Sequence, residues 1–186
     1  WEKQSDYCRR LFQDIVSTSK AVSPEMRVCI SPFFILDRNR ILGDFRFAEP
    51  AEYAQWWQTT LKQTGITWLM LQDSGEHASF TSVAEKEPFI AAYSEACKRS
   101  GVEFWLNVEI AEHDVPDYQT QRLDRDKPFN EQKWRAVPEE RLREKLALAS
   151  KFSPSAVSWG WDWWRPTSEQ SSPERYAAFQ NLNRGT

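Results

Sequence analysis

Four short apolar runs divide the chain, and each has the length of a β-strand. They span residues 28–34, 66–72, 102–109 and 156–161. Most are rich in β-branched or aromatic residues, and none alternates cleanly with polar residues as a half-solvated strand does. Strands that are covered on both faces of a parallel sheet have this composition. The pattern therefore predicts four buried, parallel strands.

Segments with helical periodicity and helix-start signals lie between these runs. A first helix is predicted before the first run, over about residues 5–20, and presents Tyr7, Leu11 and Ile15 at helical spacing. The other helices are predicted over 51–63, from Pro88 to Gly101, from Pro138, and from the pair Ser172-Pro173. Proline suits the first turn of a helix and glycine the position just after its end, which sets these boundaries.

The predicted order is one helix followed by four strand–helix units. The first three runs begin at similar intervals, which fit the βα unit of a barrel or of a doubly wound sheet. The last interval is longer, and the excess lies between Glu109 and Pro138, where a barrel enzyme builds a site or a lid. No glycine-rich nucleotide-binding sequence follows any run, which weakens the doubly wound alternative. We predict an α/β fold in which residues 1–186 form one domain, the second half of a (β/α)8 TIM barrel.

Polar residues follow the predicted strands, and in a parallel barrel these strand ends meet on the catalytic face. Glu109 is the strongest candidate for a catalytic carboxylate. Alternation along residues 104–109 places it on the same face as Trp105 and Asn107. A carboxylate buried at this position needs a function or a partner. A structural glutamate that pairs with an arginine or caps a loop is the alternative.

Asp73 follows the second run and is the other candidate catalytic carboxylate, although an aspartate there often only caps the next loop. The candidate substrate-binding residues have amide, carboxylate, imidazole or indole groups that could contact sugar hydroxyls or stack on sugar rings. They are Gln72, Glu76, Asn107, His113, Trp159, Trp161, Asp162 and Trp163. Packing or surface-loop roles are the alternatives for each of them.

Composition excludes several other classes of function. A net charge of -3 and a pI near 5.6 give no basic face for nucleic acid. No apolar run approaches the length of a membrane span. Two histidines and three widely spaced cysteines predict neither a metal site nor a cofactor. None of the four runs contains the lysine of a Schiff-base aldolase. Carboxylates, amides and indoles remain, which are the groups that glycoside cleavage uses.

Four segments, in this order, resemble successive strands of a bacterial TIM-barrel family of unknown function that is grouped with glycoside hydrolases. They are residues 30–34, 69–75, 105–109 and 158–159. The resemblance implies that they are the fifth to eighth barrel strands, with Glu109 as the nucleophile on the seventh. It also implies a general acid on the fourth strand, upstream of Trp1. A glutamate expected after Trp159 is Gly160 here.

Together these observations predict a glycoside hydrolase that acts on a polysaccharide by a two-carboxylate, retaining mechanism. A non-catalytic carbohydrate-binding barrel and a structural assembly subunit are the alternatives. Half a barrel has unpaired sheet edges, so we expect either an upstream half or a second copy of the chain as partner. The chain begins at Trp1 without a methionine, which is typical of a processed or truncated product, so the absence of a visible signal peptide does not argue for the cytoplasm. Export is the favoured location.

Overall fold

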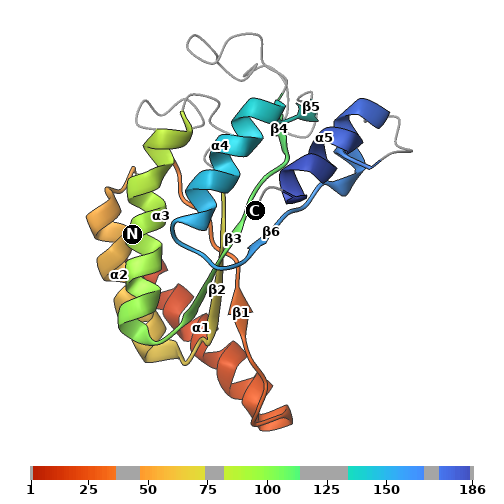
Figure 1. Cartoon of the computed structure of the whole chain (residues 1–186). Helices are drawn as coiled ribbons and strands as arrows, with labels where there is room; N and C mark the ends of the chain where they lie inside the picture. The colour runs from red at the N-terminus through yellow and green to blue at the C-terminus, as the bar shows by residue number, and fades with distance from the viewer. Residues whose placement is uncertain (1, 37–46, 74–81, 114–133, 166–171, 185–186) are drawn as a thin grey trace, which may run out of the picture. The chain divides into compact units, whose positions relative to one another are not determined.

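The computed structural model describes residues 2–36, 47–73, 82–113, 134–165 and 172–184. Its helices are α1 (Glu2–Val22), α2 (Pro50–Thr64), α3 (Val83–Ser100), α4 (Glu139–Ser150), the 3-10 helix η3 (Trp161–Trp163) and α5 (Pro173–Arg184). Its strands are β1 (Cys29–Ile30), β2 (Trp68–Gln72), β3 (Glu103–Asn107), β4 (Ala111–His113), β5 (Trp134–Ala136) and β6 (Ala156–Val157). The strands of the parallel sheet alternate with helices along the chain, so the predicted α/β class is confirmed (Figure 1).

A parallel sheet contains four of these strands in the order β1-β2-β3-β6. Cys29 of β1 lies opposite Trp68 of β2, and Leu106 of β3 lies opposite Ala156 of β6. The strands follow one another in chain order because a helical segment leads from each strand to the next. Among the described residues the sheet is open, with β1 and β6 at its edges.

The chain divides into two units, and each is described by itself. The first consists of Trp1–Pro32, Ala48–Leu71 and Pro88–Trp105. Its core includes Trp57 of α2 and Tyr93 of α3, whose ring centroids lie 5.6 Å apart. Burial raises the pKa of the Tyr93 hydroxyl well above its usual value, because the phenolate would lose its hydration there.

The second unit consists of Phe33–Phe47, Gln72–Glu87 and Leu106–Thr186. It contains the strand ends that are predicted to hold the site. Its β4 and β5 form an antiparallel pair within the segment that exceeded the expected βα spacing. The prediction that residues 1–186 form a single domain stays a prediction.

The start of α3 differs from the prediction that Pro88 opens this helix. The helix begins at Val83, five residues earlier, and Pro88 lies inside it. The Ser82 backbone N–H donates to the Glu85 carboxylate over 2.7 Å, and the Glu85 N–H donates to the Ser82 carbonyl over 3.1 Å. The sequence Ser-x-x-Glu is a capping signal, and it fixes the boundary more strongly than the proline does.

The fourth predicted strand is also shorter than residues 156–161. Parallel pairing ends at Val157, and η3 begins at Trp161 after Gly160, whose φ is 80°. The left-handed backbone at Gly160 is a conformation that favours glycine and interrupts an extended chain. The tryptophans from 161 onward therefore do not continue a strand.

Candidate active site

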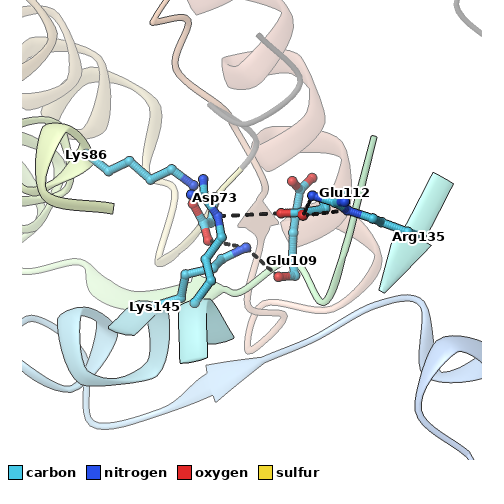
Figure 2. A network of polar contacts seen from close by, with 7 residues as sticks. Asp73, Lys86, Glu109, Glu112, Arg135 and Lys145 are labelled. Carbon is cyan, nitrogen blue, oxygen red and sulfur yellow. Dashed lines mark hydrogen bonds and ion pairs between the residues drawn. The ribbon is translucent and has the colours of Figure 1, made fainter. Parts of the chain in front are cut away.

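Asp73, directly after β2, is held by two lysines from two helices. Lys86 of α3 places its Nζ 2.5 Å from Oδ1 of Asp73, and Lys145 of α4 places its Nζ 3.0 Å from Oδ2 (Figure 2). The three side chains are between 1% and 4% exposed. Because an isolated buried charge is very unfavourable, these ion pairs are what allow the three groups to be charged at this depth.

Lys145 also connects this ion pair to Glu109. Its Nζ donates a hydrogen bond to the backbone carbonyl oxygen of Glu109, as Figure 2 shows. A second link lies close by, because the Asp73 backbone N–H donates to the carbonyl oxygen of Asn107 over 2.9 Å. Asp73 is thus joined to the last residue of β3 by a backbone hydrogen bond and to the backbone of Glu109 through the Lys145 side chain.

Glu109 itself is 1% exposed and lies two residues beyond the end of β3. The alternation predicted along residues 104–109 agrees with the burial of Phe104, Leu106 and Val108, which are 7%, 1% and 1% exposed. Asn107, on the other face of the strand, is 9% exposed. Its Oδ1 is buried and accepts no hydrogen bond from any residue that the structure describes, so it could accept one from a ligand hydroxyl or a water.

A third buried carboxylate, that of Glu112 of β4, pairs with two arginines. Arg135 of β5 places Nη2 2.9 Å from Oε1, and Arg141 of α4 places Nε 3.5 Å from Oε2. The Glu112 side chain is 1% exposed, whereas those of Arg135 and Arg141 are 35% and 17% exposed. Figure 2 shows Glu112 beside Arg135 in the same view as Glu109. Within this ion-pair group, Glu112 and Arg135 lie opposite each other on the antiparallel strands β4 and β5.

Further predicted polar residues are Gln72, Glu76 and His113. Gln72 is the half-buried last residue of β2 and forms a parallel bridge with Phe33. Glu76 lies outside the described residues. His113 ends β4 opposite Trp134, and its side chain is not among those described.

Of the predicted sugar-stacking residues, Trp159 is 39% exposed and makes an edge-to-face contact with Trp134 at 5.9 Å between ring centroids. Trp161 and Trp163 lie in η3, and Trp163 is half-buried. Asp162 is exposed and pairs with Arg165 at 2.9 Å. Trp159 is therefore more exposed than Trp163, the other tryptophan of this group whose side chain the structure describes.

The sequence prediction brought Asp73 and Glu109 to the same site but missed the residues that hold them. Those residues are Lys86 and Lys145, and the ion-pair group of Glu112, Arg135 and Arg141 was missed as well. A signal for the lysines is present: each occupies a position that helical periodicity reserves for an apolar residue. Lys86 lies between the buried Val83 and Ile90, and Lys145 lies between the buried Leu142 and Ala149.

The part of the chain that the structure describes contains neither a metal-binding cluster nor a membrane-spanning helix. No group of three or more His, Cys, Asp or Glu side chains there could hold a metal ion. No helix there has the length and apolar character to cross a membrane.

Comparison with known proteins gives a likeness to a solved structure. No family model and no curated protein matches the chain. Among solved structures, it is similar to a proposed alpha-L-fucosidase from Bacteroides thetaiotaomicron VPI-5482, with a TM-score of 0.69 and 14% sequence identity. The likeness covers 95% of this chain and 48% of that one, so the chain spans about half the length of that protein. The resemblance to a family of unknown function stays a prediction, and the structural likeness establishes that the chain shares its fold with that part of the fucosidase structure.

Proposed function

We propose that this chain is the second half of a (β/α)8-barrel glycoside hydrolase and that Glu109 is a catalytic carboxylate of that enzyme. The single observation that carries the proposal is the position of Glu109. It is a carboxylate that is 1% exposed, it lies two residues beyond the end of a parallel strand, and its backbone is held by Lys145, which also pairs with Asp73. Catalytic residues of barrels lie at this end of the strands.

The open sheet supports the half-barrel part of the proposal. Four parallel strands in chain order are half of the eight that a barrel requires, and the matched fucosidase structure is about twice as long as this chain. On β2, the side chains of Leu69 and Leu71 are fully buried, whereas those of Trp68, Met70 and Gln72 are only half-buried. Four further strands would cover this second face.

The partner that we propose is a set of four βα units upstream in the same polypeptide. In the matched structure the part that this chain does not cover belongs to the same chain, which is why we favour this arrangement over a second copy. Helix α1 also has an apolar stripe, because Tyr7, Leu11 and Ile15 are 64%, 43% and 43% exposed. In a barrel this helix would have a neighbour on each side, and α2 is one of them.

The proposed chemistry is retaining hydrolysis of a glycosidic bond. The Glu109 carboxylate attacks the anomeric carbon while an acid from the upstream half protonates the departing oxygen. Water then attacks the anomeric carbon of the glycosyl–Glu109 ester, the acid having become the base that accepts the proton of the water. Asn107 and Trp159 would bind sugar through the amide oxygen and the exposed indole. A polysaccharide substrate would be consistent with an exported protein.

A carbohydrate-binding protein without activity is the second candidate, and one observation favours it. Trp159 is a partly exposed indole that can stack on a sugar whether or not a reaction follows. The glycoside hydrolase requires the Glu109 carboxylate for its reaction, whereas the carbohydrate-binding protein does not.

The test uses aryl glycosides with a dinitrophenolate leaving group, because such a group departs without protonation and does not depend on the second carboxyl. Fucosides and other hexosides are compared. Glu109→Gln should abolish release of the phenol and preserve glycan binding. Glu139→Gln, which changes an exposed glutamate on α4, serves as the control and should retain activity. Binding without turnover in the unaltered protein would assign the second candidate, and full activity of Glu109→Gln would remove Glu109 from the mechanism.

A further inference from the structure

The Lys145 ammonium forms a hydrogen bond in addition to its salt bridge with Asp73. Lys145 donates from one ammonium group to two acceptors, the Asp73 carboxylate at 3.0 Å and the backbone carbonyl of Glu109. The three residues belong to three segments: the end of β2, the segment after β3, and the middle of α4. A single buried cation therefore links all three.

The hydrogen bond from Lys145 to Glu109 is accepted by the backbone carbonyl oxygen of Glu109. The carbonyl carbon and the side chain of Glu109 share the same Cα, so a hydrogen bond that holds the carbonyl also limits how far the carboxylate can move. The neighbouring backbone is held as well, because Val108 donates its N–H to Val157 over 2.8 Å and Ile110 accepts from Val137 over 3.1 Å. The hydrogen bond from Lys145 holds the carbonyl of Glu109, the residue between Val108 and Ile110.

We propose that Lys145 is a positioning residue for the Glu109 carboxylate and that Asp73 acts through Lys145 instead of touching the substrate. This inference rests on the proposed function of Glu109. Asp73 has both carboxylate oxygens on lysine ammonium groups, which fix the orientation of that carboxylate within the buried cluster. Its role is to keep the Lys145 ammonium charged and aimed at the Glu109 carbonyl.

Lys86 provides a matched comparison for Lys145. Both lysines are buried, both come from helices, and both contact the carboxylate of Asp73, on different oxygens. Removing the Lys86 ammonium leaves the hydrogen bond from Lys145 to the Glu109 carbonyl in place. If the cluster serves stability alone, loss of either ammonium should have the same consequences. If Lys145 positions Glu109, the two variants should differ in reaction rate.

The experiment measures kcat and KM on the aryl glycoside that the unaltered protein hydrolyses, together with thermal unfolding of each variant. Displacement of a catalytic group by about 1 Å can cost about 100-fold in rate, so Lys145→Met should lower kcat by roughly this factor with KM changed less than about threefold. Lys145→Arg, which retains a cation and donors, should recover part of the rate. Lys86→Met should lower kcat less than about tenfold, and Asp73→Asn should resemble Lys145→Met. Equal kcat values for Lys145→Met and Lys86→Met would overturn the proposal.

Two further measurements separate the possible failures. Glu109→Gln, in the same series, tests the proposed function, since full activity there would refute that function and not merely the role of Lys145. Amide hydrogen exchange at residues 108–111 tests the positioning without any substrate: it should accelerate in Lys145→Met more than in Lys86→Met, and equal acceleration would again overturn the inference. If the methionine variants do not fold, Lys145→Arg and Lys86→Arg provide the same comparison with the charge retained.

Discussion

The indole N–H of Trp164 donates a 2.9 Å hydrogen bond to the carbonyl oxygen of Ile110, the residue that follows Glu109. Trp164 is 1% exposed, Ile110 is 2% exposed, and the indole ring also lies 5.9 Å from the ring of Phe179. Trp164, in the tryptophan-rich segment after β6, is thus part of the hydrophobic core next to Ile110. Trp159, in the same segment, remains partly exposed.

This relationship predicts different stabilities for two tryptophan variants. Trp164→Phe should lower the free energy of unfolding by about 1–3 kcal/mol, because the buried Ile110 carbonyl loses its donor. Trp159→Phe should change it by less than about 1 kcal/mol, since its ring is already in contact with solvent. Urea-induced unfolding followed by circular dichroism measures both values. Similar losses in the two variants would contradict the assignment of Trp164 to the core.

The ion pair of Arg27 and Glu103 predicts a pH-dependent contribution to stability. The hydrogen bond from the Arg27 guanidinium, and then that from the Trp105 indole, hold the pKa of the Glu103 carboxyl below its usual value. A carboxyl whose pKa is lowered by folding stabilises the protein above its unfolded-state pKa, and this contribution disappears as the pH falls through the lowered value.

Glu103→Gln should therefore unfold at a lower temperature than the unaltered protein at neutral pH, and the difference should shrink below about pH 4. Thermal unfolding monitored over a range of pH measures this difference. Arg27→Gln provides the control, because the double variant should lose little more than either single variant. A temperature difference that is independent of pH would contradict this explanation.

The cysteines should differ in their reactivity. Burial raises the pKa of the Cys97 thiol to about 12, and this residue is 0% exposed. Cys29 is exposed, and its pKa is raised by partial burial. At about pH 8, iodoacetamide should modify Cys29 in the native protein and Cys97 only after addition of urea, because the thiolate is the nucleophile and must be reached. Peptide mapping by mass spectrometry identifies the sites, and Cys29→Ser should eliminate the first adduct. Native modification of Cys97 would be inconsistent with its burial.

The apolar stripe on α1 provides a test of the proposed barrel partner. In a polypeptide that includes the upstream βα units, Leu11→Glu should lower the free energy of unfolding by about 1.5–3 kcal/mol, the value of burying such a side chain. In residues 1–186 alone the same change should have little effect. Ser17→Glu adds an equal charge at an exposed position of α1 outside this stripe and should be tolerated in both. Urea unfolding measures the free energy of unfolding of both variants in both polypeptides. Sedimentation of residues 1–186 as a stable homodimer would assign the second copy of the chain as the partner instead.

Local pattern in the sequence determined the alternation of strands and helices and the positions of Asp73 and Glu109 at strand ends. Both follow from periodicity over a few neighbouring residues, because a buried parallel strand has to be apolar and a helix has to present one apolar face. The same local reasoning failed at the start of α3, where the Ser82–Glu85 capping contact determined the boundary. It also failed after Val157, where the extended chain ends and Gly160 then adopts a left-handed conformation.

Only the tertiary structure decided which charges meet. Lys86 and Asp73 are 13 residues apart in the chain, and Lys145 and Glu109 are 36 apart. No periodicity in either helix indicates which strand end a buried lysine will face, because that depends on how helices pack against a sheet. The sequence contained the signal that each lysine occupies an apolar position. The Asp73 carboxylate makes this burial possible, and only the fold brings it into contact with Lys86 of α3 and Lys145 of α4.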